Sequence, residues 1–294
     1  MILRYVEPVF RPPSEARSLL IQASIGCSNN TCAFCGSNLV KKFEIRPLEE
    51  IQEDILEARA LYGEGVRRVF LLDSNALCIR TEDLLEMLNL LYAVFPHLER
   101  VGLYACATDA LKKSEEELRE LSKAGLKIAY VGVESGDDVI LKRMRKGVTA
   151  KQTIEGCRKI MDAGITLSVT IILGLGGRER WRENAVETAK VLNQIDPPYV
   201  GALTLMVVPG TPLHRDVLED KFQVLNAQEI LREMRVLVEN LELTNCVFRS
   251  NHASNYLPLG GTLPQDKEGI LSVIDLALKK SIKVPLRPEK LRRL

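Results

Sequence analysis

Short apolar runs alternate with amphipathic helical patterns along most of this chain. The apolar runs are continuous, as expected for strands that are buried on both faces. They predict strands at 19–25, 69–72, 101–105, 128–133, 167–173, 199–208 and 247–248. Helical spacing of apolar residues predicts helices at 47–62, 81–95, 114–125, 149–164, 179–193, 226–241 and 266–280. Ser114 with Glu117, and Thr149 with Gln152, have the capping-box pattern of a helix start.

A strand followed by a helix recurs six times without an obvious linker. This order predicts an α/β fold in which parallel strands lie inside and helices lie outside. Six units are fewer than the eight of a closed barrel, so we expect a partial (β/α)6 TIM-like barrel in a single domain. Residues 1–18 are then an N-terminal extension, 19–250 the core, and 251–294 a polar segment and helix that close the barrel. Functional groups should follow the carboxyl ends of the strands.

Three cysteines lie within nine residues after the first predicted strand. Cys27, Cys32 and Cys35 have the spacing C-x4-C-x2-C. A structural zinc site and a fully ligated iron–sulfur cluster each take four protein ligands. Three thiolates can instead hold a four-iron four-sulfur cluster and leave one iron with an open position. An open position is typical of a catalytic metal site.

Other uses of these cysteines are less consistent with the sequence. The polar segment 28–31 argues against three cysteines buried as small apolar residues. The N-terminus has no apolar signal-peptide region, so disulfides are not favoured. Zinc stays open as an alternative, with His97, His214 or His252 as a fourth ligand, although none of them lies close in sequence.

The composition places few further limits on function. The chain has 294 residues, of which 46% are hydrophobic, and this is enough for a large core. Its net charge of +1 does not favour nucleic acid or an anionic membrane as a partner. No apolar run is long enough to span a membrane, and we expect a cytoplasmic protein. The remaining cysteines are scattered and are expected in the core: Cys78, Cys106, Cys157 and Cys246.

The cysteine motif and the turns after the strands resemble the radical S-adenosylmethionine (radical SAM) enzymes. More narrowly, the chain is similar to the subgroup with an Elongator-protein-3, MiaB and coproporphyrinogen-dehydrogenase type core, over roughly Leu19 to Phe248. The family loop is usually C-x3-C-x2-C, so this chain has one extra residue between Cys27 and Cys32. An aromatic residue precedes the third cysteine in the family, as Phe34 does here. The resemblance implies that the three cysteines bind the cluster.

The resemblance also implies contacts to SAM at the ends of the second and fourth strands. The family has a glycine-rich turn for the SAM amino group where this chain has Asp73 and Ser74. Asp73 is the candidate there, although an Asp that caps the next loop is an equal alternative. Glu134, helped by Ser135, is implied to contact the ribose or amino-acid part of SAM. An ion pair between Glu134 and a nearby cation, such as Lys142 or Arg143, is the alternative.

Two further turns are implied to approach the adenine. Gly174 belongs to the glycine-rich turn after the fifth strand, and Ser168 on that strand can face inward by alternation. Val208 and Pro209 begin a Pro-Gly-Thr-Pro-like turn after the sixth strand. The Lys146-Gly147 pair reads as a helix stop rather than a contact.

The segment 249–256 is dense in polar groups and follows the last predicted strand. A polar surface loop is the default interpretation. Because the segment should close the open side of the barrel, we expect Arg249, Asn251, His252 or Tyr256 to contact substrate. His252 has the pKa range of an acid or base near neutral pH.

The resemblance implies a complete reaction scheme. The cluster chelates SAM, and one-electron reduction cleaves it to methionine and a 5′-deoxyadenosyl radical that abstracts hydrogen from a substrate. We expect a small-molecule or peptide substrate and a one-electron donor such as flavodoxin or ferredoxin, with no membrane partner and no nucleic acid. Two alternatives remain: an iron–sulfur electron-transfer or cluster-carrier protein, and a zinc-stabilised α/β nucleotide-binding protein.

Overall fold

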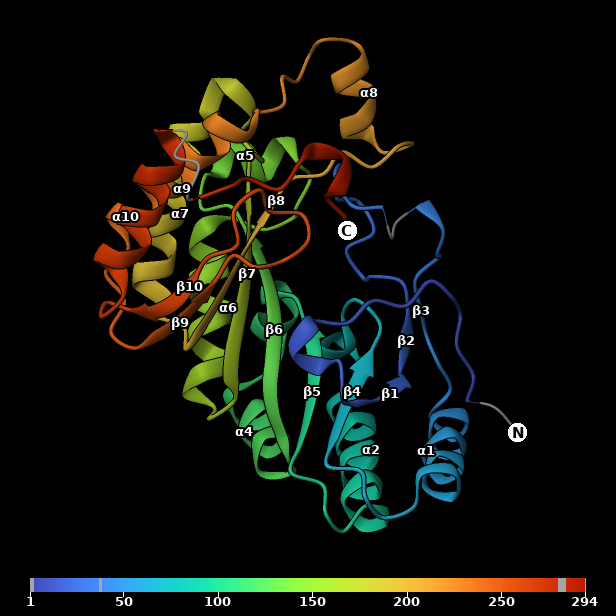
Figure 1. Ribbon diagram of the computed structural model, residues 1–294. Coiled ribbons are helices and arrows are strands. Elements are labelled where there is room, and N and C mark those ends of the chain that lie inside the picture. The colour runs from blue at the N-terminus through green and yellow to red at the C-terminus, as the bar shows by residue number, and fades with distance from the viewer. Residues whose placement is uncertain (1–2, 37–38, 280–283, 294) are drawn as a thin grey trace. The chain divides into compact units, whose positions relative to one another are not determined.

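The computed structural model describes residues 3–36, 39–279 and 284–293 (Figure 1). The chain forms two compact units, which are described separately below. Unit 1 comprises Met1–Asn30, Ser37–Val131 and Glu155–Leu167, and unit 2 comprises Thr31–Gly36, Gly132–Ile154 and Ser168–Leu294. No helix in the described ranges is long and apolar enough to cross a membrane.

The main sheet has eight strands, and their spatial order follows their order in the sequence. They are β1 (Leu19–Gln22), β4 (Arg68–Leu72), β5 (Arg100–Ala105), β6 (Leu126–Glu134), β7 (Thr166–Leu173), β8 (Tyr199–Thr204), β9 (Cys246–Arg249) and β10 (Gly260–Leu263). The pairs β1–β4, β4–β5, β5–β6, β7–β8 and β8–β9 are parallel, and β9–β10 is antiparallel. The expected α/β class with a largely parallel sheet is therefore confirmed.

Unit 1 builds its core between its strands and its helices. The helices that lie wholly in it are α1 (Leu48–Tyr62), α2 (Thr81–Val94), α3 (Ala107–Lys112) and α4 (Glu115–Lys123). α1 and α2 contact each other, and α1 also contacts β1. Phe70 packs edge-on against Tyr104 and Tyr130, with ring centroids 5.0 and 5.6 Å away. These rings fill the space beside the parallel strands.

Unit 2 contains three long helices that lie side by side (Figure 1). α9 (Ala227–Asn240) packs between α7 (Gly177–Ile195) and α10 (Lys267–Leu278). Two short helices, α5 (Asp138–Arg143) and α8 (Pro212–Leu218), follow β6 and β8 in the sequence. An apolar cluster joins these elements and includes Phe34 at its edge: Ile140, Met144, Leu175, Leu205, Leu213 and Phe222.

Local sequence signals located most element boundaries. The capping box at Ser114 is present, and so are the reciprocal hydrogen bonds of Thr149 and Gln152 before α6 (Ala150–Asp162). Asn226 forms a further capping box at the start of α9. Helix starts are predictable because their hydrogen bonds span only three residues.

Three strand predictions differ from the structure. The first predicted strand is divided into β1 and β2 (Ser24–Ile25), and β2 pairs with β3 (Glu44–Ile45) in a separate antiparallel sheet. The sixth ends at Thr204, because the chain then enters the turn that leads to α8. β9 is not the last strand, since β10 returns along it.

Candidate functional site

Asp73, directly after β4, is fully buried and has a cation of its own chain as partner. Its Oδ2 accepts hydrogen bonds from Lys41 Nζ at 2.6 Å and from Gly26 N at 3.2 Å. The side chains of both Asp73 and Lys41 are 2% exposed. Ser74 donates to Oδ1 at 3.2 Å. The Asp73 carboxylate therefore fixes the residue that immediately precedes Cys27.

A second polar cluster in unit 1 holds the residue that follows Cys27. Asn75 Nδ2 donates to Ser28 Oγ at 2.5 Å and to Asp109 Oδ2 at 2.6 Å. Asn75 Oδ1 accepts from the Cys106 amide at 3.1 Å. The sequence showed no sign of this cluster, because its members come from three separate segments of the chain. Cys27 is thus flanked on both sides by anchored residues.

In unit 2 the segment Thr31–Gly36, with Cys32 and Cys35, is anchored through its backbone. Ala33 N donates to Met144 O at 2.8 Å, and Ala33 O accepts from Leu213 N at 2.9 Å. Cys35 N donates to Cys32 O at 3.4 Å, which closes a turn between the two cysteines. Phe34, which was expected from the family motif, packs against the apolar cluster of this unit.

Val208 lies beside the same segment. A Cβ added to Gly36 would lie 2.9 Å from Val208 Cγ1, so a side chain at this position would require Val208 to shift. Thr211 Oγ1 donates to Val208 O at 2.7 Å and caps α8 by accepting from His214 N. The turn at Val208 and Pro209 is therefore held by the start of α8.

Glu134 ends β6 with a left-handed backbone, φ +64°. Its Oε1 accepts from Lys146 Nζ at 2.9 Å, and both side chains are 13% exposed. The ion-pair alternative was correct in kind but named the wrong partners, since α5 ends at Arg143 and the chain turns back through Arg145 (φ +54°). Lys146 is consequently more than a helix stop.

Ser135 and Gly174 are buried in polar networks rather than open to solvent. Ser135 Oγ donates to Asn184 Oδ1 at 2.6 Å. Gly174 has φ +84°, and its amide donates to Glu233 Oε2 at 2.8 Å. The sequence reasoning missed both Asn184 and Glu233. Ser168 is half-buried on β7 between buried neighbours, consistent with the expected alternation.

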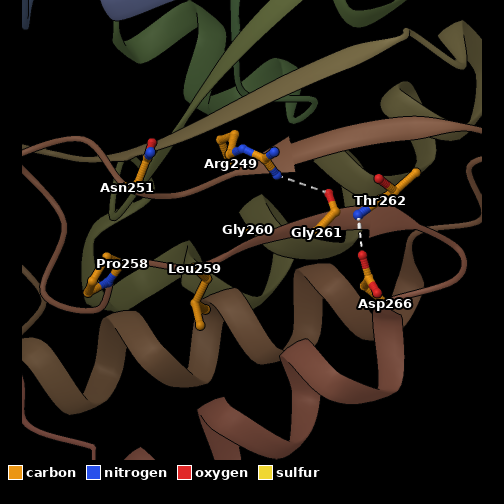
Figure 2. A pocket seen from close by; sticks show the side chains of 8 residues that line it. All are labelled: Arg249, Asn251, Pro258, Leu259, Gly260, Gly261, Thr262 and Asp266. Atoms are coloured by element: carbon orange, nitrogen blue, oxygen red, sulfur yellow. Dashed lines mark hydrogen bonds between the residues drawn. The ribbon is translucent and has the colours of Figure 1, made fainter.

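Arg249 lies in a surface pocket of about 390 Å³ across the β9–β10 pair (Figure 2). Its Nη1 donates to the carbonyls of Phe248 and Gly261, at 3.0 and 3.4 Å. At the far end of the pocket, the Thr262 amide donates to Asp266 at 2.7 Å. The pocket is lined by Arg249, Asn251, Pro258, Leu259, Gly260, Gly261, Thr262 and Asp266.

His252 and Tyr256 contact different partners from Arg249. The Tyr256 hydroxyl contacts Glu289 and accepts from Arg292 Nη1 at 2.8 Å, and the Arg292 guanidinium lies 4.3 Å from the Tyr256 ring centroid. Burial raises the pKa of Tyr256 to about 12. Burial lowers the pKa of His252, whose Nδ1 contacts Ser254. The segment 249–256 therefore divides between the pocket and the C-terminal tail, residues 284–293.

The chain's other cysteines differ from the motif cysteines in environment. Cys157 and Cys246 are buried, as expected, while Cys78 and Cys106 are half-buried. Burial raises the pKa of the Cys78 thiol to about 11 and that of the Cys246 thiol to about 12. At neutral pH these two are protonated thiols, whereas a metal ligand must be a thiolate.

The donor chemistry of the cysteine motif fits an iron–sulfur cluster, because soft thiolates on a short polar segment are its usual ligands. Within the described ranges no group of three or more His, Cys, Asp or Glu side chains is arranged to hold a metal ion. Cys27 belongs to unit 1, and Cys32 and Cys35 belong to unit 2. The three cysteines are therefore candidate ligands on the basis of residue type and spacing.

Comparison with known proteins gives a consistent result. The family model described as Radical SAM superfamily matches residues 21–189. The chain is 27% identical over 210 residues to a tRNA-2-methylthio-N(6)-dimethylallyladenosine synthase of Alkalilimnicola ehrlichii, covering 68% of this chain and 46% of that protein. It is 25% identical over 203 residues to a biotin synthase of an Azoarcus species, covering 67% of this chain and 59% of that protein. It therefore spans about half the length of such relatives.

A solved structure shares the fold. Coproporphyrinogen III oxidase (HemN) from Escherichia coli, described as a radical SAM enzyme, aligns with a TM-score of 0.56 and 15% identity, over 76% of this chain and 52% of that one. At this identity the match concerns the fold alone. Together these matches agree with the subgroup that the cysteine motif and the strand-end turns predicted.

Proposed function

Because the chain belongs to the Radical SAM superfamily, we propose that it binds a four-iron four-sulfur cluster through Cys27, Cys32 and Cys35 and cleaves SAM reductively. Enzymes of this superfamily use that cluster and SAM. When bound, the two groups supply a one-electron cleavage that yields methionine and a 5′-deoxyadenosyl radical able to abstract hydrogen from a substrate. The observation that carries the proposal is the C-x4-C-x2-C motif inside the matched region.

The role we propose for the neighbours of the cysteines is to keep the thiols in place. Asp73 and Lys41 fix Gly26, and Asn75 fixes Ser28, so Cys27 has little backbone freedom. In unit 2 the two backbone bonds of Ala33 restrain Cys32 and Cys35. Ligands held in this way lose less conformational entropy on binding metal.

We propose that SAM is held at the strand ends. Glu134 is the candidate for its ribose or amino-acid part, and its pairing with Lys146 would fix the carboxylate orientation. Gly174, with Ser168 on the same strand, and the turn at Val208 and Pro209 are the candidates for the adenine side, alongside Ser135. Asp73 already balances Lys41, so we assign Ser74 and backbone groups of that turn to the SAM amino group ahead of the Asp73 carboxylate.

For the substrate we propose a small molecule or short peptide. The Arg249 pocket offers a guanidinium, an amide and a carboxylate within about 390 Å³, a size suited to a small ligand. Burial lowers the pKa of His252, which favours the neutral imidazole, and a neutral imidazole can accept a proton. We propose a flavodoxin or ferredoxin as electron donor and the cytoplasm as location, where thiols stay reduced.

The first experiment is anaerobic reconstitution with iron and sulfide, reduction with dithionite, and addition of SAM. We expect 5′-deoxyadenosine and methionine to form in the wild type and in Cys246→Ala, a cysteine outside the motif. Both products should be lost in Cys27→Ala, Cys32→Ala and Cys35→Ala.

Other results would select an alternative. A cluster that forms without any SAM cleavage, even with an excess of reductant, favours an electron-transfer or cluster-carrier protein. Zinc in place of iron after anaerobic isolation favours the zinc-stabilised nucleotide-binding protein. The metal content and the two products are measured on the same sample.

A further inference from the structure

Glu233 on α9 is a completely buried carboxyl group that the proposed reaction does not yet use. Its relative exposure is 0%. It interrupts the apolar face of α9, since it lies three residues after Ile230 and four before Leu237, both of which are buried. Burying a carboxyl group is costly, so its partners must offset that cost.

The partners of Glu233 are two N–H groups on other elements. Oε2 accepts from the Gly174 amide at 2.8 Å, and Oε1 accepts from Asn184 Nδ2 at 2.6 Å. Burial raises the pKa of Glu233 to about 8, and the two hydrogen bonds oppose that rise. The carboxyl group therefore fixes the turn after β7, where Gly174 has φ +84°.

Asn184 extends the contact to the turn after β6. Its Oδ1 accepts from Ser135 Oγ at 2.6 Å, and its Nδ2 also donates to Ile172 O at 3.2 Å. Asn184 is 3% exposed and Ser135 0%. A continuous buried chain of hydrogen bonds thus runs from Ser135 through Asn184 and Glu233 to Gly174.

Both ends of this chain are turns that the proposed function assigns to SAM. We propose that Glu233 is a positioning residue for SAM binding: it holds the Gly174 turn against α9 and, through Asn184, in register with the turn at Ser135. This inference rests on the proposed function. Glu233 touches no ligand itself, and it acts by fixing backbone groups before SAM arrives.

The isosteric variant Glu233→Gln tests this role above pH 8, where Glu233 is ionised, because a glutamine has one acceptor oxygen and the carboxylate uses two. If the amide oxygen accepts from Gly174, the amide nitrogen faces Asn184 Nδ2, which is also a donor. With Asn184 in its present orientation, either orientation of the glutamine leaves one N–H without its acceptor. Turning over the Asn184 amide instead removes the acceptor of the Ser135 hydroxyl and the donor of Ile172 O. The loss of one such bond should weaken SAM binding about tenfold.

The double variant Asn184→Asp with Glu233→Gln is the rescue. The glutamine oxygen can then accept from Gly174 while its nitrogen donates to the new aspartate, which still accepts from Ser135. Only the carbonyl of Ile172 loses its donor. Glu239→Gln on the same helix is the matched control, since Glu239 is exposed and pairs with Arg235.

The measurements are the Kd for SAM by anaerobic calorimetry on the cluster-loaded protein, and hydrogen exchange of the 172–177 segment without SAM. We expect about a tenfold higher Kd and faster exchange in Glu233→Gln, wild-type values in Glu239→Gln, and a Kd within about threefold of wild type in the double variant. If Glu233→Gln does not fold, the double variant alone decides, because it restores the Gly174 bond.

Two results distinguish a failure of the inference about Glu233 from a failure of the proposed function. If the wild type binds SAM and Glu233→Gln binds it equally well, or if the double variant binds as weakly as Glu233→Gln, Glu233 is merely structural and the inference falls. If the loaded wild type does not bind SAM at all, the proposed function fails, and this inference fails with it.

Discussion

Three acidic side chains of low exposure, Asp73, Glu134 and Glu233, have different electrostatic surroundings. A lysine ammonium lies 2.6 Å from the Asp73 carboxylate and another lies 2.9 Å from the Glu134 carboxylate. Glu233 has only neutral donors. Removing the partner of a buried ion pair lowers the stability of the fold, because one charge stays buried alone. A buried carboxyl group without a counter-charge has a raised pKa instead, so its contribution to stability depends on pH. These differences give two predictions about single residues.

The first concerns the buried pair of Asp73 and Lys41. Asp73→Asn should lower the free energy of unfolding by about 3 kcal/mol, because it leaves the Lys41 ammonium buried without a counter-charge. Urea denaturation at pH 7 measures this change. Combining Lys41→Met with Asp73→Leu should recover most of the loss.

Asp275→Asn is the control for that substitution, because Asp275 pairs with Arg235 at the surface. It should change the stability far less than Asp73→Asn does. Equal losses of unfolding free energy at the two sites would mean that burial of the Asp73–Lys41 pair does not add to its effect on stability.

The second prediction concerns pH and Glu233, whose folded pKa is about 8 against an ordinary 4.5. Between these values the folded state binds the proton more strongly than the unfolded state, so stability falls as pH rises. The wild type should lose about 1 kcal/mol of unfolding free energy relative to Glu233→Gln for each pH unit in this window.

Urea denaturation of both proteins at pH 5, 6, 7 and 8 provides the comparison. A difference that stays constant with pH would show that the folded pKa of Glu233 is ordinary.

At this scale the sequence locates the carboxylates better than their partners. Asp73 and Glu134 are conspicuous because each follows an apolar run directly. Their lysines lie 32 and 12 residues away, in loops whose return path depends on tertiary packing. Glu233 carried a signal that could have been used, since it interrupts an apolar helix face at core spacing.

Among the elements, the C-terminal tail determines how the segment 252–256 is held. Arg292 Nε donates to Ser254 O at 2.6 Å and Nη2 to Leu205 O at 2.7 Å. Arg287 Nη1 donates to the carbonyls of His252, Ala253 and Asn255, at 3.0, 2.9 and 2.7 Å. These bonds join parts of the sequence that no local pattern connects, which is why the buried Tyr256 was expected at a substrate surface.

The third prediction tests this tail. Arg292→Lys should lower the unfolding free energy by about 2 kcal/mol, because an ammonium cannot reproduce the forked contacts of a buried guanidinium. Hydrogen exchange should become faster across residues 254–256. Arg293→Lys is the neighbouring control, since the Arg293 guanidinium donates to the nearby carbonyls of Lys290 and Arg292 and the Arg293 amide, which donates to Ala253 O, is unchanged. Equal exchange in the two variants would contradict the assigned role.

Element types were predictable where the signal is local. Capping residues marked the helix starts, and continuous apolar runs marked the parallel strands. β10 was missed because Gly260 and Gly261 resemble a turn, and only pairing with β9 makes them a strand.

At the scale of the whole molecule, charge bears on the choice of substrate. The chain carries 40 Lys and Arg against 39 Asp and Glu. A balanced surface gains little from releasing counterions at a phosphate backbone. This favours the small-molecule or peptide class over the tRNA class named for one of its relatives.

The fourth prediction follows from that balance. Binding of unmodified tRNA at about 150 mM salt should be no tighter than nonspecific binding, in the range of about 1 to 100 µM. A filter-binding titration at several salt concentrations measures it. Submicromolar affinity with a steep dependence on salt would favour tRNA as the substrate and contradict this prediction.

The fold class was predictable at this scale, because repeated strand–helix units leave few alternatives. The division into two units was not, since it cuts through β6 and β7, whose sequences are continuous. The pocket at Arg249, which we propose for the substrate, was not predictable either, because it is assembled around β9, β10 and the start of α10.

The tail described above has a consequence for divergence between related enzymes. Arg287 and Arg292 donate hydrogen bonds to the main-chain oxygens of residues 252–255, which every amino acid supplies. Ser254 and Asn255 are committed by their own side chains to β8. The His252 side chain also holds Ser254, through its hydroxyl and its amide. Asn251 and Ala253 can therefore vary without the loss of these hydrogen bonds. A library randomised at these two positions should yield mostly folded proteins, which makes the segment a natural place for new substrate preferences to evolve.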